Sequence, residues 1–266
     1  MTWIVKNVPR HTFRRNSLAV VILQLRFHPI LKVTERIADF QERVRPRFPG
    51  FDAVEAQNLD VTSDGIQVRN ETAHRFHAAA EPTVVALGTS SVSIEYRGHQ
   101  SREVLLGDAV MVLSALEAVY APIVPKRLGI RYVNLISKSR ISSELGRSVG
   151  WGDLLTQNFA KTPGGIAELD DATTFMVEVT SPCARGRMTV RYGIVPDQVS
   201  PTLFPAGSGP PTERKFRLDT DRYIDGSFKF DEVSALASDF SEDIFQIFMT
   251  AAGPALVEWM DQGALS

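Results

Sequence analysis

The stretch Arg127-Leu128-Gly129-Ile130-Arg131-Tyr132-Val133-Asn134 lies at the middle of a chain of 266 residues and decides the predicted fold. Its apolar side chains Leu128, Ile130 and Tyr132 recur at every second position, which is typical of a strand with one buried face. Prolines end the helical pattern before it, and the strand pattern runs on to residue 137. We therefore predict that this stretch opens the second half of the fold.

The first half shows one series of elements before this stretch. Residues 18–27 are β-branched and end in alternation, which indicates a strand. Residues 33–45 switch to apolar spacings of three and four, which indicate a helix. Three strand-like runs follow at 52–61, 65–79 and 83–97, with a hairpin signal at Asp64-Gly65. A long helix is predicted over 101–120, with Ser101 as its N-cap.

The second half repeats this order after the opening strand. A polar loop (138–150) leads to a short helix that begins at Trp151 and ends near Phe159. Strands are predicted at 166–180, 186–195 and 216–224, with a proline- and glycine-rich loop at 196–212. The last helix, 231–261, should break at Gly253-Pro254.

Hairpin-joined strands followed by helices favour the α+β class. We predict two pseudo-repeats of β-α-β-β-β-α that form a curved, largely antiparallel sheet covered by helices on one face. The order is similar to that of the TATA-binding protein, a likeness of topology alone. The expected organisation is a basic N-terminal arm (1–17), a first half (18–125) and a second half (126–266) that share one continuous sheet.

The central stretch also resembles a known family. Similar pieces are Gln24-Leu-Arg-Phe-His-Pro29, residues 40–49, Phe216-Arg-Leu-Asp-Thr-Asp221 and the closing helix with Phe248 and Trp259. Together they resemble a sporadically distributed family of bacterial proteins of about this size. The resemblance covers nearly the whole chain and implies no catalytic residues, because the family has no established function.

Composition favours a soluble protein of the cytoplasm. Hydrophobic residues make up 44% of the chain, but the longest apolar run, Leu18–Leu23, is far shorter than the roughly 20 residues that span a bilayer. A single cysteine, Cys183, excludes an internal disulfide and fits a reducing compartment.

Charge is unevenly placed along the chain although the net charge is −2. Residues 1–50 contain ten Lys and Arg against three acids, and residues 231–266 contain seven acids and no Lys or Arg. Such a split either marks an anionic partner for the basic end or means that the two ends neutralise one another within the fold or across an oligomer.

No motif for a metal, a nucleotide or a nucleophile occurs. His74 and His77 lie three apart in a strand pattern, where such positions point to opposite faces, and Cys183 follows a Ser-Pro turn without a local base. We therefore expect no cofactor, no metal and, on balance, no enzymatic activity.

Arginines in the strands are the more interesting candidates. Arg127 and Arg131 share one face of the central strand, and Arg26 stands in the equivalent strand of the first half. Each must pair with an acid or contact an anionic ligand. Asp219 and Asp221, together on one face of a strand with Arg217, are the candidate partners or site carboxylates.

Three functions remain open, in descending order. The first is a non-enzymatic binding or regulatory module that contacts a protein partner or a second copy, through an apolar face on the last helix formed by Phe240, Phe245, Phe248 and Trp259. The second is nucleic-acid binding by a concave sheet and the basic arm, with contacts from Arg14, Arg15, Arg26, Arg127 and Arg131. The third is an enzyme with an arginine and carboxylate cleft.

Overall fold

A computed structural model of the chain describes residues 3–62, 65–98, 101–196, 213–226 and 228–262. Asp64, His99 and the predicted loop from 197 to 212 lie outside these ranges. The helices are α1 (Ile37–Val44), α2 (Arg102–Tyr120), α3 (Lys138–Leu145), α4 (Trp151–Leu154), α5 (Val233–Ala251) and α6 (Pro254–Asp261). The strands are β1 (Leu18–Phe27), β2 (Gly50–Thr62), β3 (Gly65–His77), β4 (Thr83–Leu87), β5 (Ser91–Arg97), β6 (Pro125–Ile136), β7 (Val177–Pro182), β8 (Arg187–Pro196) and β9 (Arg214–Asp225).

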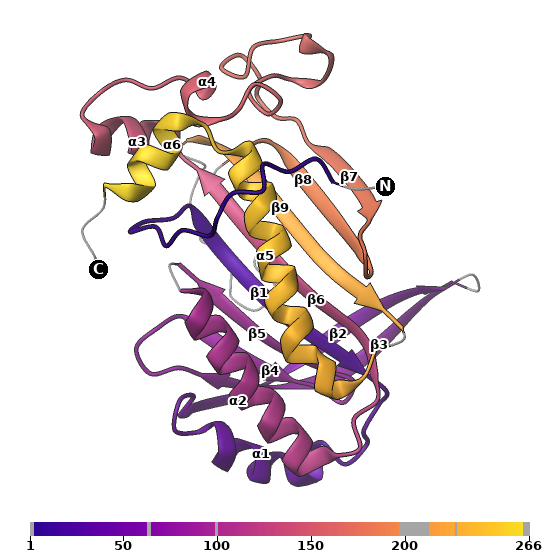
Figure 1. Ribbon diagram of the computed structural model, residues 1–266. Helices are drawn as coiled ribbons and strands as arrows, with labels where there is room; N and C mark the ends of the chain where they lie inside the picture. Colours follow the sequence, from indigo (N-terminus) through magenta and orange to yellow (C-terminus); the bar gives the residue numbers. More distant parts are fainter. Residues whose placement is uncertain (1–2, 63–64, 99–100, 197–212, 227, 263–266) are drawn as a thin grey trace. The chain divides into compact units, whose positions relative to one another are not determined.

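Within the described ranges, the nine strands form one open antiparallel sheet in the order β2-β3-β4-β5-β1-β6-β9-β8-β7 (Figure 1). The predicted α+β class and the antiparallel sheet are therefore confirmed. The hairpin predicted after residue 61 is also present, because Thr62 is paired with Gly65.

The chain divides into two compact units that do not follow chain order. Unit 1 comprises Met1–Val21, Arg131–Tyr223 and Asp239–Ser266, and unit 2 comprises Ile22–Ile130 and Ile224–Ser238. The strands β1, β6 and β9 and the helix α5 each contribute residues to both units.

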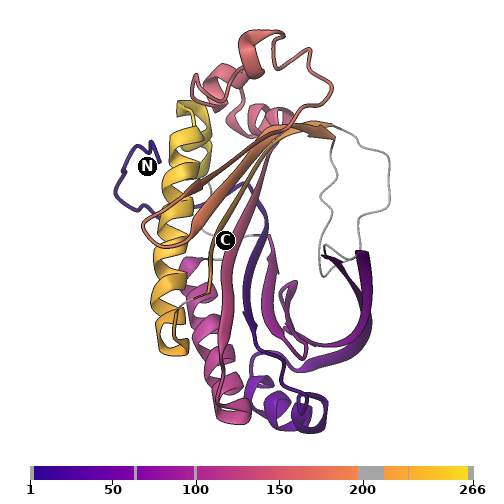
Figure 2. The same ribbon diagram turned by 90° about the vertical axis from the view of Figure 1, so that its right-hand side faces the viewer.

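In unit 1, α5 covers one face of β6, β9 and β8, as Figure 2 shows. Tyr132 of β6 shares a hydrogen bond of 3.0 Å with Ser241 of α5, and the Arg222 guanidinium of β9 stacks 4.3 Å above the Phe240 ring. Phe216, Leu218 and the α6 residue Trp259 belong to the same apolar core. Burial of this core is the main source of stability for the unit.

In unit 2, α1 and α2 cover the strands. Phe40 of α1 packs on Phe76 of β3 with ring centroids 5.3 Å apart. Tyr96 of β5 donates a hydrogen bond of 2.9 Å to Asp108 of α2, and Arg47 pairs with the same carboxylate. Ser101 caps α2 by accepting from the Val104 amide, as predicted.

Some element predictions were wrong. The single strand expected at 83–97 is the hairpin β4–β5, because Gly88 donates a backbone hydrogen bond to Ser91 across a tight turn. The polar loop expected at 138–150 contains α3, which Ser137 caps and which Gly146 ends in a left-handed conformation. The helix expected from Trp151 to Phe159 is only the single turn α4.

Two further boundaries differ, and one break is confirmed. The strand expected at 166–180 begins only at Val177, because residues 163–165 form a 3-10 turn and 166–176 are irregular. The last helix breaks at Gly253-Pro254 as predicted. Proline at the first turn of α6 cannot supply the amide that would continue α5.

His74 should make the stability of the protein depend on pH. Its side chain is 5% exposed, both ring nitrogens lack a hydrogen-bond partner, and burial lowers its pKa. The unfolded chain therefore binds more protons at this histidine than the folded chain does as the pH falls through 6.5, so stability falls with the pH. Between pH 7 and pH 5 we expect a loss of up to about 2 kcal/mol in urea denaturation.

His74→Leu should flatten this pH dependence, whereas the exposed His28→Gln should retain it. A His74→Leu protein with the same loss between pH 7 and pH 5 would assign the effect to other groups.

Candidate functional site

A row of alternating charges crosses four strands of unit 1. Arg131 of β6 binds Asp219 of β9 through two parallel hydrogen bonds of 2.8 and 2.7 Å. Asp219 stands opposite Arg191 of β8 in the strand register, and Arg191 pairs with Glu178 of β7 at 2.5 Å. Residues opposite one another share a face of the sheet. We call these four residues the charge ladder.

Asp219 is the buried centre of the ladder. Its side chain is fully buried and also accepts a 2.6 Å hydrogen bond from Arg217. Burial alone would raise the pKa of Asp219, but the hydrogen bonds and charges of Arg131 and Arg217 outweigh it and lower the pKa. The hydrogen bond from Arg131 to Asp219 in turn raises the pKa of Arg131, to which the charge of Asp221 also contributes.

The ion pair predicted for Asp219 is therefore present, and its carboxylate is buried. The Asp219 carboxylate is buried because the two arginines lie over it and exclude water from it. A carboxylate held by two charged donors cannot act as a general base near neutral pH, since its pKa lies far below the operating range. The ladder is thus an element of structure and not an acid–base pair.

Two of the other four predicted arginines also have carboxylate partners. Arg127 pairs with Asp225 at 3.0 Å, a residue that we did not predict. Arg15 of the arm pairs with Glu144 of α3. Arg26 is exposed and forms no ion pair within the described residues. The exposed Arg14 donates its backbone amide to Met260.

The apolar face predicted on the last helix is not available for a partner. Phe240 is 1% exposed and Trp259 is 2% exposed, so both belong to the core of unit 1. Phe245 and Phe248 are half-buried. The prediction was wrong for Phe240 and Trp259 because the helix is covered on two sides, by the strands and by the arm.

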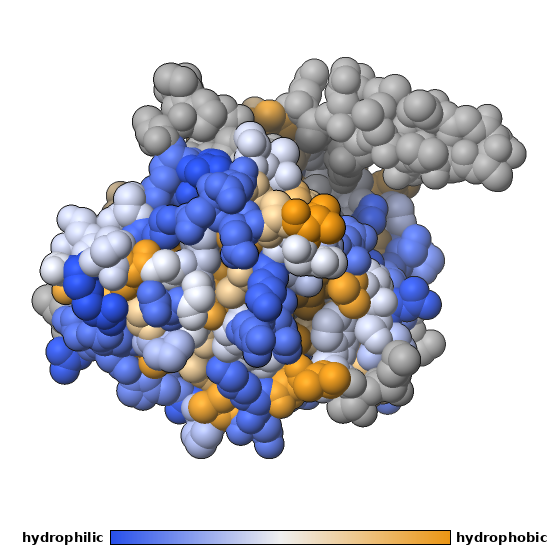
Figure 3. Space-filling model, turned by 90° about the horizontal axis from the view of Figure 1, so that it is seen from above, coloured by the Kyte–Doolittle hydropathy of each residue, from blue (hydrophilic) through white to orange (hydrophobic). Residues whose placement is uncertain are grey.

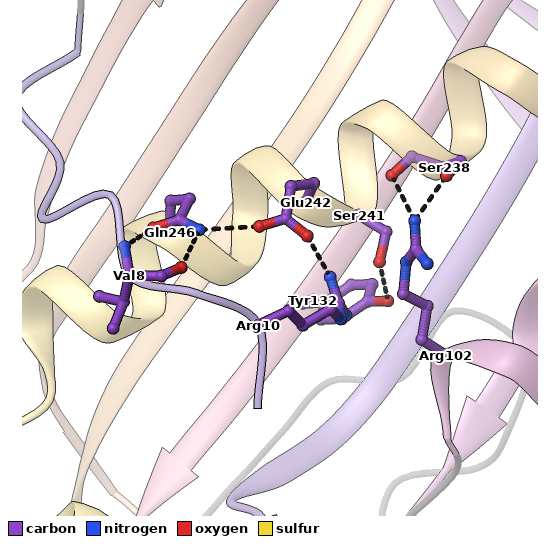
Figure 4. A network of polar contacts seen from close by, with 8 residues as sticks. All are labelled: Val8, Arg10, Arg102, Tyr132, Ser238, Ser241, Glu242 and Gln246. Atoms are coloured by element: carbon purple, nitrogen blue, oxygen red, sulfur yellow. Dashed lines mark hydrogen bonds and ion pairs between the residues drawn. The ribbon is translucent and has the colours of Figure 1, made fainter. Parts of the chain in front are cut away.

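The N-terminal arm lies along α5 on the side opposite to the strands (Figure 2). In the polar contacts between them, an amide or a charged group of the arm meets a side chain of the helix, and Figure 4 shows those of Val8 and Arg10. The pairs are the Lys6 amide with Thr250 at 3.0 Å, the Val8 amide and carbonyl with the Gln246 amide group at 2.8 Å each, and Arg10 with Glu242 at 2.8 Å. The Arg10 guanidinium also lies 4.9 Å from the Phe245 ring centroid.

The spacing of these pairs has a physical basis. The arm contacts the helix at every second residue and the helix contacts the arm at every fourth, in opposite directions. Four residues of a helix advance about 6 Å, and two residues of the arm keep pace with this rise, with a turn of the backbone at Asn7, whose φ is 52°. The rows therefore stay in register, and α5 presents a polar stripe to the backbone of the arm. We call Glu242, Gln246 and Thr250 the α5 stripe.

The α5 stripe was missed from the sequence. Its members recur every four residues, but the same helix also contains Ser238, Asp239, Ser241 and Asp243, so the spacing did not stand out. The uneven charge of the chain is partly explained by the same contacts. Arg10, Arg15 and His11 of the basic arm pair with Glu242, Glu144 and Asp261.

One pocket lies beside the arm. It has a volume of about 600 Å³ and is lined by Trp3, Cys183, Arg222 and Asp243 among others. Burial raises the pKa of the Cys183 thiol, which keeps it protonated and weakly nucleophilic. Arg222 is committed to Asp243 at 2.7 Å. The pocket holds no activated nucleophile.

A second, larger hollow lies on the surface of unit 1. It is shallow, has a volume of about 760 Å³ and is formed by residues of the arm, α4 and α6, including Lys6 and Gly253. Over the described ranges, no group of three His, Cys, Asp or Glu side chains could hold a metal ion. On the face seen in Figure 3, hydrophobic residues form separate small groups among hydrophilic ones.

Comparison with known proteins adds no family. No protein-family model matches the chain, and no curated protein matches it. None of the helices in the described part of the chain is long and apolar enough to cross a membrane.

Proposed function

We propose that the protein is a non-enzymatic binding module that acts through protein–protein contact, with a partner or with a second copy of itself. The observation that carries this proposal is the α5 stripe. Gln246 both accepts from and donates to the main chain at Val8, and such main-chain hydrogen bonds hold a segment independently of its side chains. Glu242 adds a preference for a basic residue two positions further on.

The arm occupies this surface within the same chain. A segment from elsewhere that follows the same backbone path and has a matching basic residue would compete with it. The exchange costs little, because the incoming segment forms the same kinds of hydrogen bond and ion pair that the arm gives up. The arm thus acts as an internal competitor that sets how readily α5 accepts a partner.

Exchange of the arm can be tested with a charge reversal. Arg10→Glu places a carboxylate beside Glu242 and should release the arm while leaving the α5 stripe intact. A labelled peptide of residues 3–16 should then bind the Arg10→Glu chain at least tenfold more tightly than the wild-type chain, as measured by fluorescence anisotropy. A tenfold change corresponds to about 1.4 kcal/mol.

The matched control is the double variant Arg10→Glu with Glu242→Arg. It restores an opposite pair between arm and helix, so the peptide should again bind weakly. Equal affinity of all three chains for the peptide would remove the support for an exchangeable surface. Light scattering on the same proteins separates a partner from self-association.

Nucleic acid is a less favoured partner. Arg15, Arg127 and Arg131 already have carboxylate partners, and phosphate contacts would have to replace those pairs. Binding to DNA or RNA would therefore be weak even at low salt, where counterion release favours it most.

We also propose that the fold contains two pseudo-repeats. Outward from the middle of the sheet, the strands follow the orders 1-5-4-3-2 and 6-9-8-7, which supports a repeated order like that of the TATA-binding protein. Each series starts with a central strand, continues with helix α1 or helices α3 and α4, and closes with α2 or α5. Membership in the bacterial family named above and a location in the cytoplasm, which the free thiol of Cys183 suits, belong to the same proposal.

A further inference from the structure

β7 ends the sheet on the side of unit 1 (Figure 1). Its residues are mostly exposed, and Val179 is 44% exposed. Edge strands in soluble proteins are usually short or protected by charges and prolines, because their free backbone groups pair readily with other chains. The direction of these groups in β7 can be worked out from the register.

The backbone of β7 points alternately toward β8 and away from the sheet. The bonds from Phe175 to Ile194 and from Cys183 to Gly186 show that odd-numbered residues face β8. The amides and carbonyls of Glu178 and Thr180 therefore point outward, and neither residue has a backbone hydrogen bond within the described residues. Pro182, the next outward position, has no amide hydrogen and so limits the open edge to these two residues.

The side chains at the same two positions end two rows that cross the sheet. Glu178 is the last member of the charge ladder and is 54% exposed. Thr180 ends a second row, in which its hydroxyl lies 2.8 Å from the hydroxyl of Thr189. A further strand with a basic residue beside Glu178 and a hydroxyl residue beside Thr180 would continue both rows. Pairs of this kind stabilise neighbouring strands.

We propose that the edge of β7 binds an extended segment of a protein partner, in which a Lys or Arg side chain lies beside Glu178. Main-chain hydrogen bonds to Glu178 and Thr180 supply affinity, and the charge of Glu178 selects the segment. This inference adds a second surface to the proposed function and does not require the arm to leave α5.

The sequence of β8 provides a probe, because β8 already presents Arg191 to Glu178 and Thr189 to Thr180. A labelled peptide copying Arg187–Pro196 is titrated onto the full chain and followed by fluorescence anisotropy. Methylation of the peptide amides that copy Thr189 and Arg191 should weaken binding at least tenfold, because these amides would face β7. Methylation of the amides that copy Val190 and Tyr192, which face away, should leave binding within twofold.

Charge reversal identifies the edge. Glu178→Arg should weaken binding of the peptide at least tenfold. A peptide with Glu in place of the residue that copies Arg191 should bind this variant again. Arg10→Glu, which frees the arm, should bind the β8 peptide like the wild type. A failure of the β7 proposal can therefore be distinguished from a failure of the arm exchange.

No saturable binding of the peptide, or equal loss of binding from methylation at both sets of amides, overturns the proposal. Self-association of the chain that Glu178→Arg abolishes would assign the edge to a second copy and overturn it as well.

Discussion

Asp219→Ala is expected to lower the free energy of unfolding by about 4 kcal/mol, because it leaves Arg131 and Arg217 without their shared carboxylate. Removal of one partner from a buried ion pair costs far more than the pair itself contributes, since the remaining arginines keep only part of their contact with water. Urea denaturation at pH 7 measures the change. Circular dichroism should show that the variant is folded at low urea.

The control is Asp225→Ala, which removes the partner of Arg127. The Asp225 side chain is 60% exposed, so the change should stay within about 1 kcal/mol. A similar cost for both variants would mean that burial of Asp219 is irrelevant to its contribution.

The pH dependence provides a second test of Asp219. The pKa of Asp219 is lower in the folded chain than its ordinary value near 3.9. Its ion pairs therefore add stability above that value, and this stability is lost as the pH falls through the folded pKa. Asp219→Ala should remove this part of the acid-induced loss, while the loss due to His74 at higher pH should persist.

Gly193→Ala is expected to destabilise the protein by about 3 kcal/mol, the second largest effect. A Cβ atom at Gly193 would lie 2.0 Å from the Phe175 carbonyl oxygen and 2.8 Å from the carbonyl carbon. Both are backbone atoms, held by the hydrogen bond from Phe175 to Ile194. The methyl group can fit only if the segment before β7 moves away.

Gly107→Ala is the matched control. Gly107 lies inside α2, and no atom lies within 4 Å of a Cβ placed there. Alanine favours a helix over glycine, so this variant should be more stable than the wild type by about 0.5–1 kcal/mol. Thermal denaturation followed by circular dichroism compares the two. Equal melting temperatures for Gly193→Ala and the wild type would show that the segment yields without cost.

Local patterns predicted most of the elements. The alternation in residues 18–27 and the Ser101 cap predicted β1 and α2 at nearly their observed limits, because both signals depend on near neighbours only. The helix α3 was missed although Ser137 and Gly146 mark its ends, since its polar composition resembles a loop. The hairpin β4–β5 was predicted as one strand for a related reason, as three small residues are a weak turn signal.

Local sequence patterns do not predict the contacts at the charge ladder and the α5 stripe. The sequence by itself determined the class of the fold, the central strand and the charges that had to be neutralised, because periodicity and composition depend on neighbouring residues. Only the tertiary structure decided which charges meet. Arg131 binds Asp219, 88 residues away, and Val8 meets Gln246, 238 residues away. These pairings follow from strand order and from the matching rise of the arm and the helix, and neither can be predicted from residues that are close in sequence.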